Sequence, residues 1–215
     1  MKKKILSIAL VVAMVAVIAA GSLAYFTDKD NATNTFTTGK VDITLNDKFE
    51  QGSKLLPAVV DEEDNILNAV DKVVSVTNNN DSEEAYVRVH IAVPKSICPL
   101  IGLWTMDGAE GWIGAGDTRE EDPAYTMTID NVEYNVFVNT YTKKLTAKET
   151  TTNILDAVTM EPEATNEQVA AVNGNFNILV FAEGCQAAGF PDAETALNTA
   201  FGVPGSEGYI APWNR

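Results

Sequence analysis

Alternation of apolar and polar residues is the clearest pattern in this chain. Every second residue of Ala85–Val93 is apolar, and a shorter alternating run occupies Val74–Val76. A period of two is typical of a strand that turns one face to a core. The polar, turn-forming stretch Asn78–Ser82 separates the two runs. We therefore predict two neighbouring strands that form an antiparallel pair.

Other segments repeat this pattern. Asp130-Asn131 lies between the strand-like runs Thr126–Ile129 and Val132–Tyr141, as the turn of a hairpin would. The remaining strand-like runs are Val41–Leu45, Ile154–Met160 and Asn175–Ala182. Residues 46–70, which carry the acidic run Asp61–Asp64, have no such pattern and are expected to form a solvated loop.

One helix is predicted near the C-terminus. Asp192 is a suitable N-cap, Glu194 lies in the first turn, and Gly202 provides a stop signal. Leu197 and Phe201 are one helical turn apart and would face the protein together. The sequence thus predicts a short C-terminal helix.

Seven or so short strands followed by one helix predict an all-β fold, an antiparallel β-sandwich with loop insertions. The pattern alone does not separate a jelly roll from an immunoglobulin-like topology. An insertion is expected at about 94–125, which contains five glycines together with Trp104 and Trp112. These tryptophans either form a surface-binding loop or cover the sheet.

The first residues have the pattern of a secretory signal peptide. Lys2–Lys4 precede the apolar run Ile5–Ala20, and small residues, Ser22 and Ala24, occupy the −3 and −1 positions. Cleavage between Ala24 and Tyr25 would remove residues 1–24 and leave 25–215 as a single domain. The alternative is a retained membrane anchor, for which the apolar run is short.

The chain is strongly acidic, with 15 basic and 30 acidic side chains and a net charge of −15. The signal peptide takes three lysines with it, which leaves 12 basic residues against 30 acidic ones, a net charge of −18. Nucleic acid and anionic lipid require clustered Lys and Arg. The charge therefore excludes nucleic-acid partners and suits a secreted protein.

Few residues suggest a catalytic or metal-binding role. His90 is the single histidine, and the alternation places it with Tyr86, Arg88 and Ala92 on the face opposite the valines, as an ordinary strand residue. Since HExxH, GxSxG and GxxxxGK[ST] motifs are missing, we predict no enzyme activity, no catalytic residue, no metal ligand and no cofactor. Cys98 and Cys185 either pair in a disulfide or are small buried apolar residues.

A family resemblance starts at the cleavage site. Gly21–Asp28, followed by Asn34–Ile43, resembles the SipW-type signal peptide and the mature N-terminus of the TasA/camelysin family of bacterial exported proteins. Weaker similarity continues in Val74–Asn78 with Ala85–Val89, in Lys144–Thr146 with Glu149–Thr151, and in Ala182–Phe190.

The resemblance implies a jelly-roll subunit of extracellular biofilm matrix fibres, located in the matrix or at the cell surface. The N-terminal strand of one subunit would complete the sheet of the next in a head-to-tail homopolymer. The implied donor-strand residues are Tyr25, Phe26, Phe36, Val41, Ile43 and Leu45. Export would involve a dedicated signal peptidase, and contacts with other matrix or cell-surface components are left open.

Three alternatives remain at this point. Phe36–Leu45 is equally suited to be the first strand of its own sandwich. Camelysin-like members of the family are classed as cell-surface metallopeptidases, which offers an enzyme hypothesis. The third alternative is a monomeric surface-binding or adhesion module that uses Trp104 and Trp112.

Overall fold

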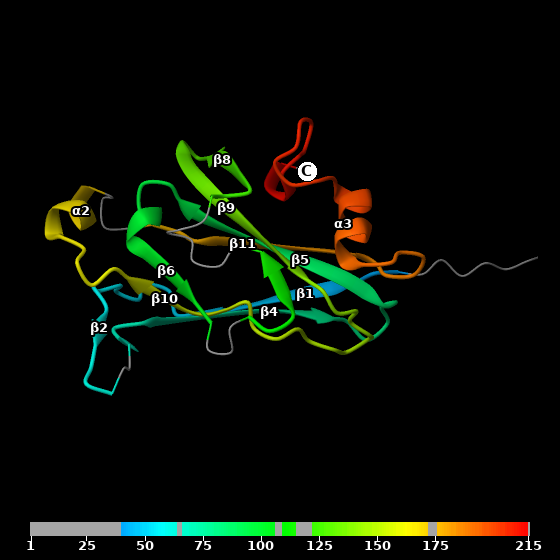
Figure 1. Ribbon diagram of the computed structural model, residues 1–215, viewed down its shortest axis with the longest axis horizontal. Helices are drawn as coiled ribbons and strands as arrows, with labels where there is room; N and C mark the ends of the chain where they lie inside the picture. The colour runs from blue at the N-terminus through cyan, green and yellow to red at the C-terminus, as the bar shows by residue number, and fades with distance from the viewer. Residues whose placement is uncertain (1–39, 64–65, 106–108, 115–121, 172–175, 215) are drawn as a thin grey trace, which may run out of the picture. The chain divides into compact units, whose positions relative to one another are not determined.

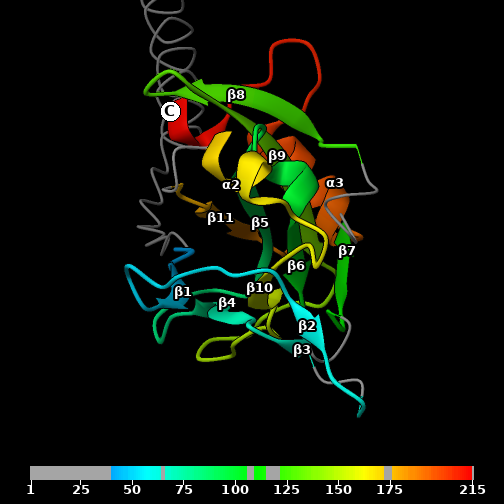
Figure 2. The ribbon, with the colours of Figure 1, turned by 90° about the vertical axis from the view of Figure 1, so that its left-hand side faces the viewer.

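The computed structural model describes residues 40–63, 66–105, 109–114, 122–171 and 176–214. These residues form two antiparallel sheets, which lie in separate layers in Figure 2. The first sheet has the order β1 (Ile43–Phe49), β4 (Val70–Asn78), β10 (Leu155–Met160) and β6 (Ile101–Trp104). The second has the order β11 (Leu179–Gln186), β5 (Ala85–Pro94) and β9 (Val132–Tyr141), with β7 (Trp112–Gly114) and β8 (Tyr125–Ile129) both paired to the far edge of β9.

The smaller elements lie around this sandwich (Figure 1). They are the two-stranded sheet of β2 (Val59–Val60) and β3 (Ile66–Leu67), the helices α2 (Asn166–Ala171) and α3 (Ala193–Phe201), and the 3₁₀ turns Cys98–Leu100 and Pro212–Asn214. The predicted fold class, an all-β, jelly-roll-like antiparallel sandwich with a short C-terminal helix, is confirmed.

The predicted antiparallel pairing of the strands at Val74–Val76 and Ala85–Val93 is wrong. Both strands exist, but β4 belongs to the first sheet and β5 to the second, so the chain between them crosses from one sheet to the other. Asn78 is fully buried at this crossing, and its side-chain amide donates to the carbonyl oxygens of Glu83 and Leu145, each at 2.9 Å. The polar stretch therefore bridges two layers instead of closing a hairpin.

Three segments are more regular than expected. The loop predicted at 46–70 contains the end of β1 and the pair β2 and β3, while the insertion at about 94–125 contributes β6 and β7 to the two sheets. The last strand begins at Leu179 and continues through Cys185. Backbone pairing with a neighbouring strand stabilises each of these stretches, although their side chains do not alternate.

The β8–β9 hairpin and the C-terminal helix agree with prediction. Asp130 and Asn131 have φ values of 50° and 65°, as a two-residue type I′ turn requires. The side chain of Asp192 accepts a hydrogen bond from the Thr195 amide as the N-cap of α3. Gly202 ends the helix with a φ of 88°, a conformation that glycine adopts without steric cost.

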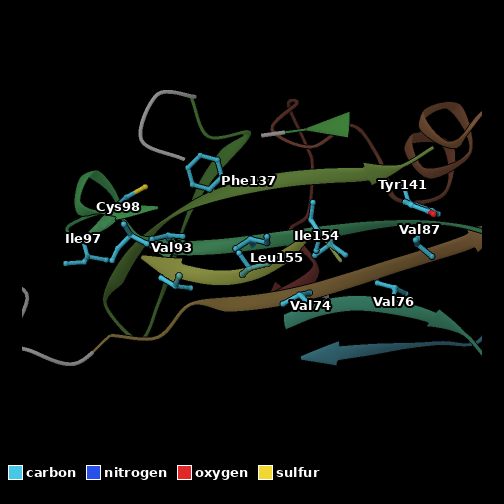
Figure 3. Close-up of a cluster of buried hydrophobic side chains, with 14 of the residues drawn as sticks. Val74, Val76, Val87, Val93, Ile97, Cys98, Phe137, Tyr141, Ile154 and Leu155 are labelled. Carbon is cyan, nitrogen blue, oxygen red and sulfur yellow. The ribbon is translucent and has the colours of Figure 1, made fainter. Parts of the chain in front are cut away.

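The main core lies between the two sheets (Figure 3). It includes Val74 and Val76 from the first sheet and Val87, Val89 and Phe137 from the second. All ten residues of β5 are buried, because α3 contacts the outer face of the second sheet. The alternation of β5 thus separates two different interiors, the apolar core on one face and a polar one beneath α3 on the other.

Candidate functional site

The candidate donor-strand residues fall into two groups. Tyr25, Phe26 and Phe36, like the expected cleavage site at Ala24 and Tyr25, lie outside the described residues. Val41, Ile43 and Leu45 are described and are each half-buried. Ile43 and Leu45 pack against the main core from β1.

β1 is the edge strand of the first sheet. All seven of its residues are in antiparallel register with β4, from Ile43 opposite Asn78 to Phe49 opposite Lys72. Side chains also link the two strands, because the Asn46 amide donates to the hydroxyl oxygens of Ser75 and Thr77 at 3.2 and 2.9 Å. Within the described residues, β4 is the single strand that pairs with β1.

Two further contacts fix β1 at its ends. Lys72 of β4 is buried, donates to both carboxylate oxygens of Asp47 at 2.8 Å, and lies 5.3 Å from the ring centroid of Phe49. At the other end, Ile43 fits over Gly184 of β11, where a Cβ atom would lie 3.0 Å from the Ile43 side chain. Glycine at position 184 therefore makes room for the Ile43 side chain.

The two tryptophans of the predicted binding loop have different environments. Trp112 packs against the main core, 5.0 Å from Tyr141 between ring centroids, and its indole nitrogen donates to the Thr152 carbonyl oxygen at 3.1 Å. Trp104 ends β6 and is 40% exposed. Trp112 thus helps to close the sandwich, and a binding role for Trp104 stays a prediction.

The two cysteines are buried in different clusters of the core. Cys185 is opposite Tyr86 near the start of β5, whereas Cys98 follows Pro94, the last residue of β5. Tyr86 and Pro94 are eight positions apart, which corresponds to about 26 Å of strand. The four residues after Pro94 could return at most about 14 Å. The remaining separation exceeds the ~7 Å that a disulfide permits, so the structure does not join Cys98 to Cys185.

Burial also changes the chemistry of both thiols. It raises the pKa of Cys98 above its usual value and raises the pKa of Cys185 to about 11. Because the thiolate is the reactive form of cysteine, both side chains are protonated and unreactive at neutral pH. The structure thus shows the two cysteines as small buried residues, the second of the two interpretations.

The polar interior beneath α3 contains an ionic network that the sequence analysis missed. Glu183 of β11 accepts hydrogen bonds from Nε of Arg88 and from Nε2 of His90, the latter at 3.0 Å. The other ring nitrogen of His90 lies 3.0 Å from the Tyr125 hydroxyl. The exposed fractions of the Arg88, His90 and Glu183 side chains are 1%, 0% and 2%. Solutes therefore cannot reach these groups.

The network also attaches the C-terminal segment to the second sheet. Arg88 donates from Nη1 to the side-chain oxygen of Asn198 in α3 and to the carbonyl oxygen of Gly202, each at 3.2 Å. Its guanidinium lies 5.7 Å from the ring centroid of Phe201 and 5.9 Å from that of Tyr209. A single buried cation thus contacts the helix, its C-cap and the segment that follows.

The charge state of Glu183 results from opposing effects. Burial alone would raise its pKa, but the hydrogen bond from His90 and the positive charge of Arg88 together hold the pKa of Glu183 below its usual range. Burial also raises the pKa of Tyr125, so its hydroxyl keeps its proton. Glu183 is therefore an ionised carboxylate at neutral pH and acts as the acceptor of the network.

The family comparison adds evidence at the N-terminus. The model of the family described as camelysin metallo-endopeptidase matches residues 1–52. The N-terminal segment is similar to camelysin. The TasA/camelysin resemblance is thereby confirmed, and within the described residues the match includes β1. Comparison with curated proteins and with solved structures gives no match.

The family description implies a metal, and the described residues do not fit one. His90 is the single histidine of the sequence, and both of its ring nitrogens have partners within the buried network. Within the described ranges, no group of three or more His, Cys, Asp or Glu side chains could hold a metal ion. Nor does any helix in this part of the chain combine the length and apolar character needed to cross a membrane.

Proposed function

We propose that this protein is a structural subunit of bacterial extracellular matrix fibres, which assembles by exchange of its N-terminal segment between copies. The position of β1 carries the proposal: it is an edge strand, its backbone pairs with β4, and it lies within the segment that matches the camelysin family. The signal-peptide pattern of residues 1–24 supports export.

The contacts of β1 suit such an exchange. They are made to β4, to Gly184 of β11 and to the core edge, and none of them requires that the strand come from the same chain. A neighbouring copy offers an identical acceptor once its own β1 has left. Exchange of an identical element is a low-cost route to assembly, and an added strand provides main-chain hydrogen bonds together with specific side-chain sites.

The exchange is testable with two variants, Thr44→Cys and Thr77→Cys, each of which adds one cysteine to the buried Cys98 and Cys185. The two positions are directly opposite in the β1–β4 register, where Cβ atoms of cross-strand neighbours are ~5 Å apart. The two variants are mixed, allowed to assemble and oxidised. We expect a disulfide between different chains on a non-reducing gel. Thr44→Cys mixed with Ile113→Cys, on exposed β7, is the matched control.

Two results would contradict the exchange. The first is assembled protein in which the mixed pair does not cross-link, while a double Thr44→Cys/Thr77→Cys chain cross-links internally. The second is equal cross-linking of the control pair, which would indicate random collision. The first result would show that each β1 stays with its own β4, and the second would show that the cross-links between chains do not come from the β1–β4 register.

A metallo-endopeptidase is the second candidate function, favoured by the description of the matching family. It would need metal ligands other than the engaged His90, because the sequence has no further histidine. Zinc sites in peptidases normally take three protein ligands rich in histidine. The fibre subunit is therefore the function that the described residues support best.

A further inference from the structure

Exposed apolar side chains gather on the hairpin formed by β2 and β3. Of the twelve large apolar side chains that are exposed among the described residues, five lie in this stretch. Their exposed fractions are 51% for Leu56, 51% for Val59, 56% for Val60, 37% for Ile66 and 47% for Leu67. Such a concentration marks an interaction surface, because monomeric proteins rarely expose contiguous apolar patches.

Hydrogen bonds hold the base of the hairpin, whereas the side chains beyond the base are exposed to solvent. The amide of Ala58 donates to the Met160 carbonyl oxygen of β10 at 2.9 Å, and the Asn68 side chain donates to the Pro57 carbonyl oxygen at 3.1 Å. Val59 and Val60 are adjacent in β2, so their side chains lie on opposite faces, yet both are more than half exposed. A two-stranded hairpin is marginally stable alone in water, so both faces favour a partner.

The hairpin and the start of β1 lie at opposite ends of the first sheet. β3 precedes the first residue of β4, whereas Ile43 is opposite Asn78, the last residue of β4. The nine residues of β4 separate the two ends by about 27 Å. In Figure 1 the cyan hairpin and the blue start of β1 accordingly lie far apart along the sheet.

We propose that the β2–β3 hairpin binds a second copy of this chain, at the end of that copy where β1 begins. The inference rests on the proposed function in that the second copy is the next subunit of the fibre. Residues 25–39, which precede Lys40 at that end, comprise 15 residues, enough for a reach of up to about 50 Å. A segment of that length is long enough to place Tyr25 and Phe26 on the apolar hairpin of an adjoining copy. A contact between two different ends does not close on itself and extends into a filament.

The test measures self-association of the full mature chain by sedimentation velocity over a concentration series. Val59→Ser/Val60→Ser removes the apolar side chains of β2, and Ile113→Ser/Val203→Ser is the control, because those side chains are 69% and 50% exposed elsewhere. We expect the hairpin variant to associate roughly tenfold to a hundredfold more weakly than the wild type. The control should associate as the wild type does.

The outcomes separate this inference from the proposed function. Wild-type association of the hairpin variant, with Thr44–Thr77 cross-links between chains, would overturn the inference and leave strand exchange standing. Hairpin-dependent association with cross-links confined within chains would support the inference and overturn the exchange. A chain that stays monomeric at every concentration would overturn both.

Discussion

The buried network beneath α3 yields a quantitative prediction, the effect of Glu183→Gln on stability. Glutamine has nearly the same shape as glutamate but carries no charge. Its side-chain oxygen can still accept from His90, while the guanidinium of Arg88, 1% exposed, loses its counter-ion. Removal of one member of a buried ion pair costs about 3–5 kcal/mol, because the remaining charge stays desolvated.

The retained hydrogen bond places the expected loss at the lower end, about 3 kcal/mol. Since folded domains have a free energy of unfolding of roughly 5–15 kcal/mol, this is a large fraction of the total. With a denaturant slope of about 2 kcal/mol per molar urea, the unfolding midpoint should fall by roughly 1.5 M. Tryptophan fluorescence suits the assay, because Trp213 lies 6.1 Å from His90 between ring centroids.

Glu50→Gln is the matched control, because Glu50 is exposed and the same chemical change there should leave the free energy of unfolding within about 0.5 kcal/mol of wild type. Replacement of both ionic partners, as in Arg88→Met/Glu183→Leu, should recover much of the loss, because no unpaired charge remains. A Glu183→Gln midpoint equal to that of Glu50→Gln would refute the argument that Arg88 depends on this carboxylate.

The pH dependence follows from the lowered pKa of Glu183. A carboxyl group with a lower pKa in the folded state contributes stability that is fully present above its unfolded pKa of about 4.5. That contribution is lost as the pH falls through the folded-state value. The stability difference between wild type and Glu183→Gln should therefore be constant above about pH 5 and shrink in acid. A difference that grows in acid would contradict this assignment.

Three further outcomes are expected. Deletion of Tyr25–Thr35 should leave a folded chain that retains β1 but needs a higher protein concentration to form fibres by light scattering and electron microscopy, and fibres as abundant as those of the full mature chain would contradict the proposed contact of residues 25–39 with the hairpin. Asn78→Ala should lower the free energy of unfolding by about 2 kcal/mol in urea titration, because two buried hydrogen bonds, to the carbonyl oxygens of Glu83 and Leu145, are lost. Purified protein should neither bind stoichiometric zinc nor cleave casein in a chelator-sensitive manner, and loss of such an activity in His90→Ala would establish the peptidase instead.

Local features of the fold were predictable because their signals are contained in a few consecutive residues. The cap at Asp192, the stop at Gly202 and the Asp130-Asn131 turn each require a specific backbone conformation that the residue itself favours. Strand pairing is different, since it depends on residues far away in the sequence. The stretch after β4 has the composition of a hairpin turn, but Asn78 bonds to Leu145, 67 residues further on, and the chain crosses to the other sheet.

The network was missed for a related reason. Alternation correctly placed Arg88 and His90 on the face of β5 opposite the valines. Glu183 was overlooked because the apolar run before it suggested that the strand ended at Ala182, whereas β11 continues to Gln186. The usable signal was a charged residue flanked by Ala182, Gly184 and Cys185, small residues typical of buried positions. A buried acid needs a partner, and Arg88 and His90 were the basic residues already placed on a buried strand.

The energetics of β1 connect the proposed exchange to the hairpin interface. Within one chain, β1 is tethered next to its own β4, which gives a millimolar effective concentration for pairing. The β1 of another copy makes the same register with the same β4, from Ile43 to Phe49, and so gains no contact that could offset the tether. Exchange alone would therefore dominate only at millimolar protein concentrations.

A second contact formed only between copies changes this balance, because every tenfold gain in affinity lowers the required protein concentration tenfold. The apolar β2–β3 hairpin is a surface able to supply such a contact, and it lies at the end of the sheet that a head-to-tail neighbour would meet. Loss of the hairpin contact should accordingly raise the concentration needed for fibres without unfolding the subunit.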